Sequence, residues 1–206
     1  MIKQLNMNVY EAAQKRIKWT FDNFNKICVS FSGGKDSTVM THMVMEEAIK
    51  RNRKVALLFI DWEIQYKMTI AHVKRVFEMY KDYIDPYWVA LPLLTDNACS
   101  QFEPEWICWD RDKKDAWVRQ PDEISITDEN FFPFWYYKIT FEEFVPKFGE
   151  WYGKGERTAC LVGIRTRESL NRWRALTNQR KNVFHDKLFT TCVTDQVYNV
   201  YPIYDW

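Results

Sequence analysis

The first ninety residues alternate between amphipathic stretches and short, continuously apolar runs. The amphipathic stretches repeat their apolar side chains every three or four positions, which is the spacing of one helix face. The apolar runs are rich in β-branched and aromatic residues, as is typical of strands buried on both faces. This order predicts a parallel sheet with helical crossovers. Helices are expected at 8–24, from 37 to about 51, and at 66–83, and strands at 26–31, 55–60 and 87–91.

The pattern changes after residue 94. Residues 94–150 are dense in Trp, Phe, Tyr and Pro, and they are too apolar for a linker, so we expect an insertion that folds over the edge or mouth of the sheet. Within it, Thr140 to Glu143 has the form of a capping box that begins a helix. The chain then resumes with a strand at 159–164, a helix at 171–176 and short strands or a hairpin at 188–204. We therefore predict an α/β fold in one domain over residues 1–206, with a five-stranded, mostly parallel sheet flanked by helices.

Composition excludes several classes of protein. With 47% hydrophobic residues and a net charge of +1, the chain is neither disordered nor generally attracted to polyanions or anionic membranes. No apolar run is long enough to cross a membrane, and the N-terminus lacks the features of a signal peptide. The five cysteines are scattered without a Cys-x-x-Cys pair, and the three histidines have no metal-site spacing. A reduced, cytoplasmic protein is expected.

Candidate chemistry begins at Ser32–Ser37, with the sequence Ser-Gly-Gly-Lys-Asp-Ser, between the first strand and the next helix. Glycines let a backbone approach an anion closely, and the free N–H groups of a helix start point toward it. Lys35 adds a positive charge. The Walker A spacing fails because Val29 and Asp36 stand where it requires Gly and Ser or Thr. The Gly-x-Gly-x-x-Gly dinucleotide fingerprint is absent as well, so the turn indicates an anion site of another kind.

Charged residues also follow two other predicted strands. Asp61 and Glu63 end the strand at 55–60, and Arg165 and Arg167 follow the strand at 159–164. In an open α/β sheet, ligands bind at the carboxyl ends of the strands where the strand order reverses. If the first and the 159–164 strands are neighbours, Arg165 faces the glycine turn across that crevice. Guanidinium suits phosphate or sulfate through its forked donors.

The turn resembles the pyrophosphate-binding loop (PP-loop) of the N-type ATP pyrophosphatases and of the phosphoadenosine phosphosulfate (PAPS) reductase family. Tryptophan-rich segments in the middle of the chain resemble one branch of that family, the IbrA-like proteins. That branch is often described as co-activators of prophage gene expression, encoded beside a ParB-like partner. The resembling segments are Ser32–Ser37, Phe59–Glu63, Leu161–Ser169 and Tyr201–Trp206 for the family, and Trp88–Leu93, Trp106–Asp110 and Trp117–Arg119 for the branch.

The resemblance implies an adenine nucleotide α-hydrolase-like, Rossmann-like fold that binds ATP, or PAPS or adenylyl sulfate, with Mg²⁺. Lys35 and Arg165 are the expected catalytic residues, through charge stabilisation. Asp36 and Asp61 are the expected Mg²⁺ ligands, although Asp36 could instead cap the helix. The expected nucleotide-binding residues are Ser30, Ser32, Gly33, Gly34, Lys35, Asp36, Ser37, Asp61, Gly163, Arg165, Arg167 and Glu168.

The implied reaction is attack at the α-phosphate of ATP, with release of pyrophosphate and an adenylated intermediate. Sulfonucleotide reduction is an alternative, but the nucleophilic cysteine segment of the reductases, Glu-Cys-Gly-x-His, has no match here. A non-catalytic regulatory subunit that works with a ParB-like partner, or as a homo-oligomer, and an RNA-modifying enzyme also remain open. Residues 165–187 are basic, yet the aromatics fit a core or a protein interface better, so nucleic acid is expected as an indirect or weak partner. IbrA-like proteins usually continue past the Pro-Ile-Tyr-Asp-Trp segment, so a C-terminal part is expected beyond it.

Overall fold

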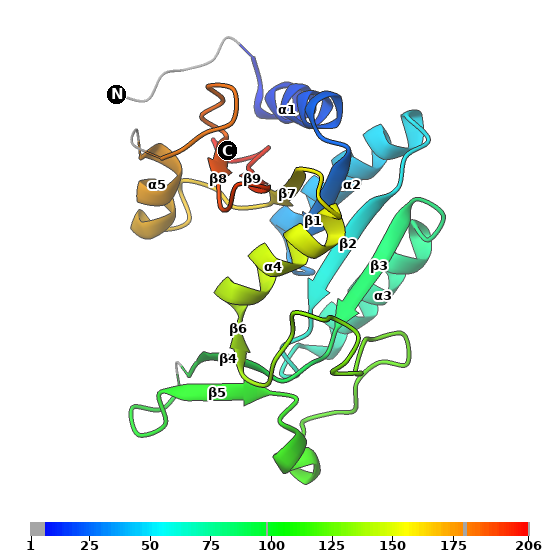
Figure 1. Cartoon of the computed structure of the whole chain (residues 1–206), viewed down its shortest axis with the longest axis vertical. Helices are drawn as coiled ribbons and strands as arrows, with labels where there is room; N and C mark the ends of the chain where they lie inside the picture. Colours follow the sequence, from blue (N-terminus) through cyan, green and yellow to red (C-terminus); the bar gives the residue numbers. More distant parts are fainter. Residues whose placement is uncertain (1–6, 98, 179–180, 206) are drawn as a thin grey trace.

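A six-stranded sheet forms the centre of the computed structural model, which describes residues 7–97, 99–178 and 181–205 (Figure 1). The strand order is β3-β2-β1-β7-β9-β8; the first five strands are parallel, and β8 pairs antiparallel with β9. The strands are β1 Lys26–Ser30, β2 Val55–Ile60, β3 Ile84–Val89, β7 Thr158–Val162, β8 Thr190–Cys192 and β9 Val197–Val200. The helices are α1 Val9–Asn23, α2 Lys35–Lys50, α3 Lys67–Met79, α4 Phe141–Gly153 and α5 Leu170–Thr177.

Helices cover both faces of the sheet. Side chains of α1, α2 and α3 pack on one face with alternate residues of β1, such as Ile27 and Val29. The intervening Cys28 points to the other face, where it joins Phe144 and Phe148 of α4. Figure 1 shows α4 crossing that face. The period-two alternation of a strand thus gives each face its own apolar core.

The α/β class and the mostly parallel sheet are confirmed. Helices and strands lie at the predicted places, with β3 beginning earlier, at Ile84, and with β8 added as an antiparallel edge strand. Thr140 and Glu143 form the predicted capping box, and α4 continues through Pro146. No helix among the described residues is both long and apolar enough to cross a membrane.

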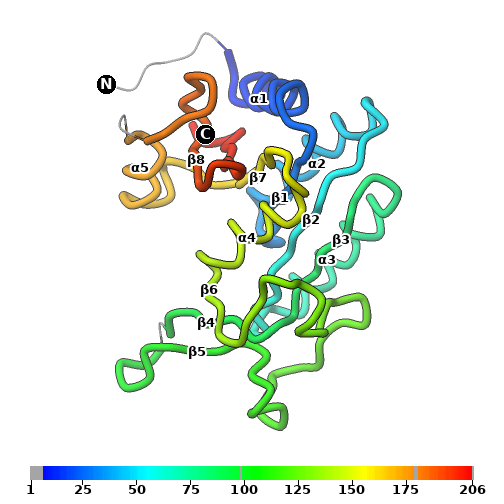
Figure 2. Tube along the Cα trace, viewed as in Figure 1, coloured from blue at the N-terminus to red at the C-terminus, as the bar shows by residue number. Residues whose placement is uncertain are grey.

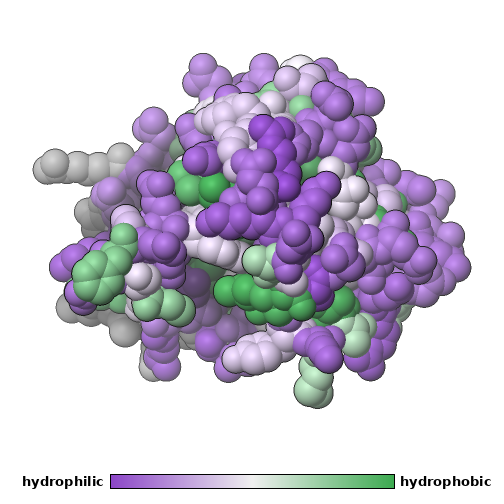
Figure 3. All heavy atoms as spheres, turned by 90° about the horizontal axis from the view of Figure 1, so that it is seen from below, coloured by the Kyte–Doolittle hydropathy of each residue, from purple (hydrophilic) through white to green (hydrophobic). Residues whose placement is uncertain are grey.

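The aromatic insertion has a small sheet of its own, with strand order β5-β4-β6. These strands are β4 Leu93–Asp96, β5 Glu105–Cys108 and β6 Ile139–Thr140, and a short 3-10 helix, η1, spans Arg111–Ala116. The sequence pattern did not predict this sheet. The trace in Figure 2 places the insertion below the carboxyl ends of β2 and β3. From below, the molecule is mostly hydrophilic, with a band of hydrophobic side chains near the centre (Figure 3).

A buried carboxylate ties the insertion to the main sheet. Asp61 directly follows β2, is 0% exposed, and accepts hydrogen bonds from Trp88 Nε1 at 2.8 Å and from the backbone N–H of Glu63 at 3.0 Å. Its Oδ1 also forms an ion pair with Arg119 of the insertion. The backbone oxygen of Asp61 accepts a hydrogen bond from Trp109 Nε1 at 2.6 Å. Asp61 is therefore the centre of a network that joins three segments.

Glu63 is a second tether, two residues further on. Its side chain is buried, and its backbone has a left-handed φ of +64°. Its carboxylate accepts hydrogen bonds from the backbone N–H groups of Trp109 at 2.8 Å and Val118 at 3.0 Å. Buried backbone donors in irregular loops need such partners, so this acid holds the insertion loops in place.

We expect Asp61→Asn to destabilise the protein, because it leaves the Arg119 guanidinium without its buried counter-ion. Breaking a buried pair costs about 3–5 kcal/mol, and partial exposure of Arg119 favours the lower end of that range. Glu78→Gln, which removes an exposed ion pair with Lys81, is the matched control and should leave stability unchanged. Urea unfolding of both variants measures the difference. Equal stability of Asp61→Asn and wild type would contradict the anchoring role.

Candidate functional site

The candidate site lies where the strand order reverses. From β1 the chain proceeds to β2 and β3 on one side, while β7 and β9 lie on the other. β1 and β7 are parallel neighbours, with Ser30 opposite Val162 at their carboxyl ends, which meets the condition under which Arg165 faces the glycine turn. In open α/β sheets, ligands bind in a crevice beyond the strand ends at such a reversal. The glycine turn and the Gly163–Glu168 segment lie on either side of it, and we call them the two walls of the candidate crevice.

The two glycines of the turn have different roles. Gly33 has a φ of +74°, and a Cβ atom there would lie 2.8 Å from Cγ2 of Thr69 and 3.0 Å from Cγ2 of Val73 on α3. Gly34 is the N-cap of α2, and no side chain caps that helix end. The N–H groups of the first helical turn therefore have no capping partner and can receive an anion.

Hydroxyl groups fix the shape of the turn. Ser37 Oγ donates to the backbone oxygen of Gly34 at 3.0 Å, so in its 2.9 Å contact with Ser32 Oγ the Ser32 hydroxyl must be the donor. The backbone N–H of Gly34 in turn donates to Ser32 Oγ at 3.3 Å. Ser37 is buried and Ser32 is exposed. Ser37 thus acts from within the turn, while Ser32 lies at its open side.

Thr38 and His72 support the turn and were not found from the sequence. Thr38 Oγ1 donates to the Gly34 oxygen at 2.8 Å, so His72 Nε2, at 2.9 Å, must be the donor to Thr38 Oγ1. Burial, with smaller contributions from Arg75 and His42, lowers the pKa of His72. The lowered pKa favours a neutral imidazole ring, and the donor role of Nε2 places the proton of that ring on Nε2. The two residues are 34 positions apart, and no sequence spacing connects them.

Gly163 brings the second wall against the first. A Cβ atom on Gly163 would lie 3.0 Å from Cα and 3.1 Å from the backbone nitrogen of Ser37. These distances are shorter than an ordinary contact, and both atoms belong to the backbone, which cannot turn aside as a side chain can. A glycine at this position therefore permits the end of β7 to touch the first turn of α2.

Arg165 extends from the second wall to the turn. Its Nη2 lies 3.1 Å from Oδ2 of Asp36, and its Nε lies 3.6 Å from Oε1 of Glu168. Glu168 also pairs with Arg172 on α5. Asp36, expected as an Mg²⁺ ligand or a helix cap, pairs with Arg165 in this structure and does not cap α2. The pair is partly exposed, with side-chain exposures of 23% for Arg165 and 18% for Asp36.

The structure brings most of the predicted site residues together, but not all of them. Lys35 and Arg167 are exposed, whereas Ser30 is half-buried at the end of β1. Asp61 is instead enclosed in the network of the insertion, and its two carboxylate oxygens already accept bonds from three donors. The residues that form the two walls are Ser32, Gly33, Gly34, Lys35, Asp36, Ser37, Gly163, Arg165 and Glu168.

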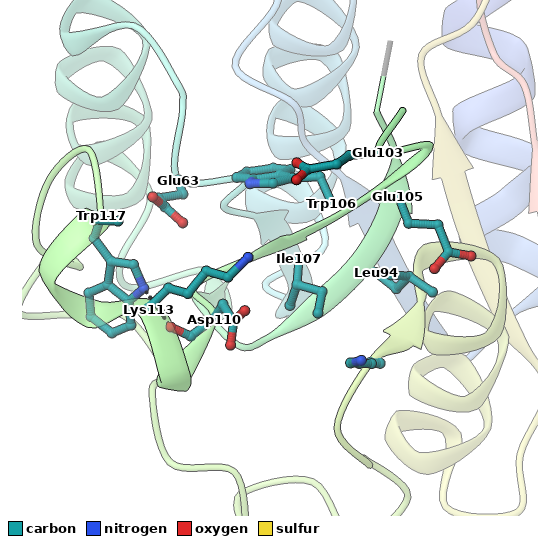
Figure 4. Close-up of a pocket in the computed structure, with 11 residues that line it drawn as sticks. Glu63, Leu94, Glu103, Glu105, Trp106, Ile107, Asp110, Lys113 and Trp117 are labelled. Atoms are coloured by element: carbon teal, nitrogen blue, oxygen red, sulfur yellow. Dashed lines mark hydrogen bonds between the residues drawn. The ribbon is translucent and has the colours of Figure 1, made fainter. Parts of the chain in front are cut away.

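A separate pocket of about 220 Å³ lies in the insertion (Figure 4). Two tryptophans and four carboxylates line it, and Lys113 extends across it (Figure 4). Tyr137 donates to the carboxylate of Asp110 at 2.9 Å, and burial together with this acid raises the pKa of Tyr137 to about 12. Lys113 and Lys138 partly offset the four carboxylates, so the pocket is not a plain acidic site. Its aromatic and acidic lining includes Glu63, Glu103, Glu105, Trp106, Asp110 and Trp117.

Comparison with known proteins gives the following similarities. Residues 26–96 match the family model of the phosphoadenosine phosphosulfate reductase domain. The uncharacterized protein YbdN of Escherichia coli (strain K12) is 46% identical over 205 residues, which cover 98% of this chain and 50% of that protein. The chain thus spans about half the length of this curated relative.

Two solved structures of Candida glabrata FMN adenylyltransferase are also similar. One is a complex with FAD and inorganic pyrophosphate, at 15% identity and a TM-score of 0.48, covering 100% of this chain and 56% of that one. The other is a complex with ATP, at 14% identity and a TM-score of 0.49, covering 100% and 55%. The match to the phosphoadenosine phosphosulfate reductase domain covers residues 26–96, from β1 through β4, and this part of the chain is similar to that family in sequence.

Proposed function

We propose that the chain binds ATP or an adenylated sulfonucleotide in the crevice between β1 and β7, and that bound ATP is cleaved between its α- and β-phosphates. One observation carries this proposal. The uncapped first turn of α2 follows a glycine turn at the reversal of strand order, with the Arg165 guanidinium beside it. Free N–H groups and a guanidinium on facing walls match the charge and the donors that a polyphosphate requires.

Each wall has a defined part in this reaction. An acceptor oxygen forms a bond to the α-phosphorus while the bond from that phosphorus to the bridging oxygen breaks, and pyrophosphate leaves with the electron pair. The N–H groups of the turn and Lys35 hold the leaving phosphates. Arg165 offsets the charge that develops on them. For this, Arg165 exchanges Asp36 for a phosphate oxygen.

Mg²⁺ fits beside the turn through Asp36. Mg²⁺ is commonly held by one or two carboxylates together with substrate phosphates, and it neutralises phosphate charge when bound. Among the described residues, no group of three or more His, Cys, Asp or Glu side chains could hold a metal ion. Asp36, released from Arg165, supplies the one carboxylate that such a site requires. A contribution from Asp61 would require its network with Arg119 and Trp88 to open.

Two alternative functions, a sulfonucleotide reductase and a non-catalytic regulatory subunit, require different features of the chain. A reductase needs a reactive thiolate, but Cys28, Cys108 and Cys160 are buried, and the exposed Cys99 and half-buried Cys192 belong to neither wall of the crevice. A hydrogen bond with Cys160 and burial raise the pKa of Cys28, and burial raises the pKa of Cys108 to about 12. A regulatory subunit would bind the same nucleotide without turnover, working with a ParB-like partner or a second copy. Pyrophosphate release by the wild type, alone and with that partner, distinguishes the enzyme from the regulator.

Lys35→Ala should weaken nucleotide binding by about 1–3 kcal/mol, the scale of a lost hydrogen bond to a charged group. Calorimetry with ATP, adenylyl sulfate and PAPS in the presence of Mg²⁺ measures the change. Lys50→Ala is the matched control, because Lys50 is an exposed lysine in the last turn of the same helix. Equal binding by Lys35→Ala and Lys50→Ala, or no binding of any of the three nucleotides by wild type, would overturn the site.

Arg165→Ala should weaken binding of the same nucleotides by about 1–3 kcal/mol while the Tm stays nearly unchanged. The reason is that the partly exposed pair with Asp36 contributes little to folding. Arg75→Ala, at an exposed position of α3, serves as control. A collapse of the Tm in Arg165→Ala would show that this arginine is structural, and unchanged affinity would remove it from the site.

A further inference from the structure

Helix α5 stands on the surface directly after the arginine-bearing wall of the crevice (Figure 1). Only Leu176 of its eight residues is buried. Leu170 and Trp173 are 60% and 48% exposed. Large apolar side chains gathered on one exposed element indicate a surface that receives a partner.

The charge of this part of the chain is strongly unbalanced. Residues 165–187 carry seven Arg and Lys residues against two acidic ones, a net charge of +5 in a chain whose total is +1. The rest of the chain is therefore acidic on balance. A local basic segment on an otherwise acidic protein attracts a polyanion to that segment rather than to the whole surface.

One face of α5 carries both large apolar side chains and an arginine. Leu170, Trp173 and Arg174 occupy positions i, i+3 and i+4, which are neighbours on a helix surface. Arg167 is exposed in the turn that precedes the helix. Within the described part of the chain, Arg167 and Arg174 form no ion pair, whereas Arg172, which projects from another side of the helix, pairs with Glu168. We call Arg167, Leu170, Trp173 and Arg174 the α5 surface.

We propose that the α5 surface binds single-stranded nucleic acid, with bases stacked on Trp173 and phosphates paired with Arg167 and Arg174. Unpaired arginines beside an exposed indole are the combination that such strands require, since charge holds the backbone and an aromatic face holds a base. An acidic protein would use the arginines but not the indole. A duplex, whose bases are already stacked, offers no base to Trp173. This proposal goes beyond the nucleotide site and does not depend on it.

Fluorescence anisotropy tests the proposal with a fluorescein-labelled strand of mixed sequence, offered as RNA and as DNA, each single-stranded and as a duplex. We expect wild type to bind the single strands more tightly than the duplexes. Trp173→Ala should weaken single-strand binding about 5- to 100-fold, as for loss of one base stack. Arg174→Ala should weaken binding of every strand and reduce its dependence on salt between about 50 and 200 mM NaCl.

Tyr10→Ala is the matched control, since Tyr10 is an exposed aromatic residue on α1, and it should bind like wild type. Calorimetry should show that Trp173→Ala binds ATP as wild type does. ATP binding therefore tests the nucleotide site, and strand binding tests the α5 surface independently of it. Three results would overturn the proposal: no strand binding by wild type at low salt, equal binding by Trp173→Ala and Tyr10→Ala, or competition by poly-glutamate as effective as that by unlabelled single strand.

Discussion

The candidate site depends on one close backbone contact, between Gly163 at the end of β7 and Ser37 in the first turn of α2. The parallel pairing of β1 with β7 brings these segments to the same edge of the sheet. The missing side chain at Gly163 then lets them touch. A larger residue would separate the walls, and Arg165, two residues further on, would move with its wall. The Arg165 guanidinium thus faces the uncapped start of α2 because of the strand order and a single glycine.

Two ion pairs on the same edge of the sheet differ in the free energy needed to break them. Arg165 and Asp36 are both partly exposed, and pairs near solvent contribute about 1 kcal/mol or less. The Asp61 side chain, by contrast, is fully buried, although its partner Arg119 is partly exposed. Removing one partner of a buried pair costs about 3–5 kcal/mol. A phosphate can therefore replace Asp36 on Arg165 at little cost. The network of Asp61 is better suited to holding the insertion than to exchanging ligands.

Much of the fold could be predicted because its signals are local. Continuous apolar runs give β1 and β2, helical spacing gives α1, and the Thr140–Glu143 capping box gives the start of α4. The role of Asp61 was less predictable, because a carboxylate after a strand has the same local sequence whether it meets a ligand or a buried arginine 58 positions away. The sheet β5-β4-β6 was missed for a similar reason. Its strands are two to four residues long and pair across loops, so little periodicity marks them.

The central claim is that the first turn of α2 and the glycine turn bind a phosphate anion. Backbone amide chemical shifts during a titration with inorganic pyrophosphate and Mg²⁺ test it most directly, because they report on the N–H groups themselves. If the turn binds the anion, the largest shifts occur at Gly33, Gly34 and Lys35. Shifts confined to the insertion pocket around Trp106 and Trp117, or the absence of any saturable shift, would contradict it.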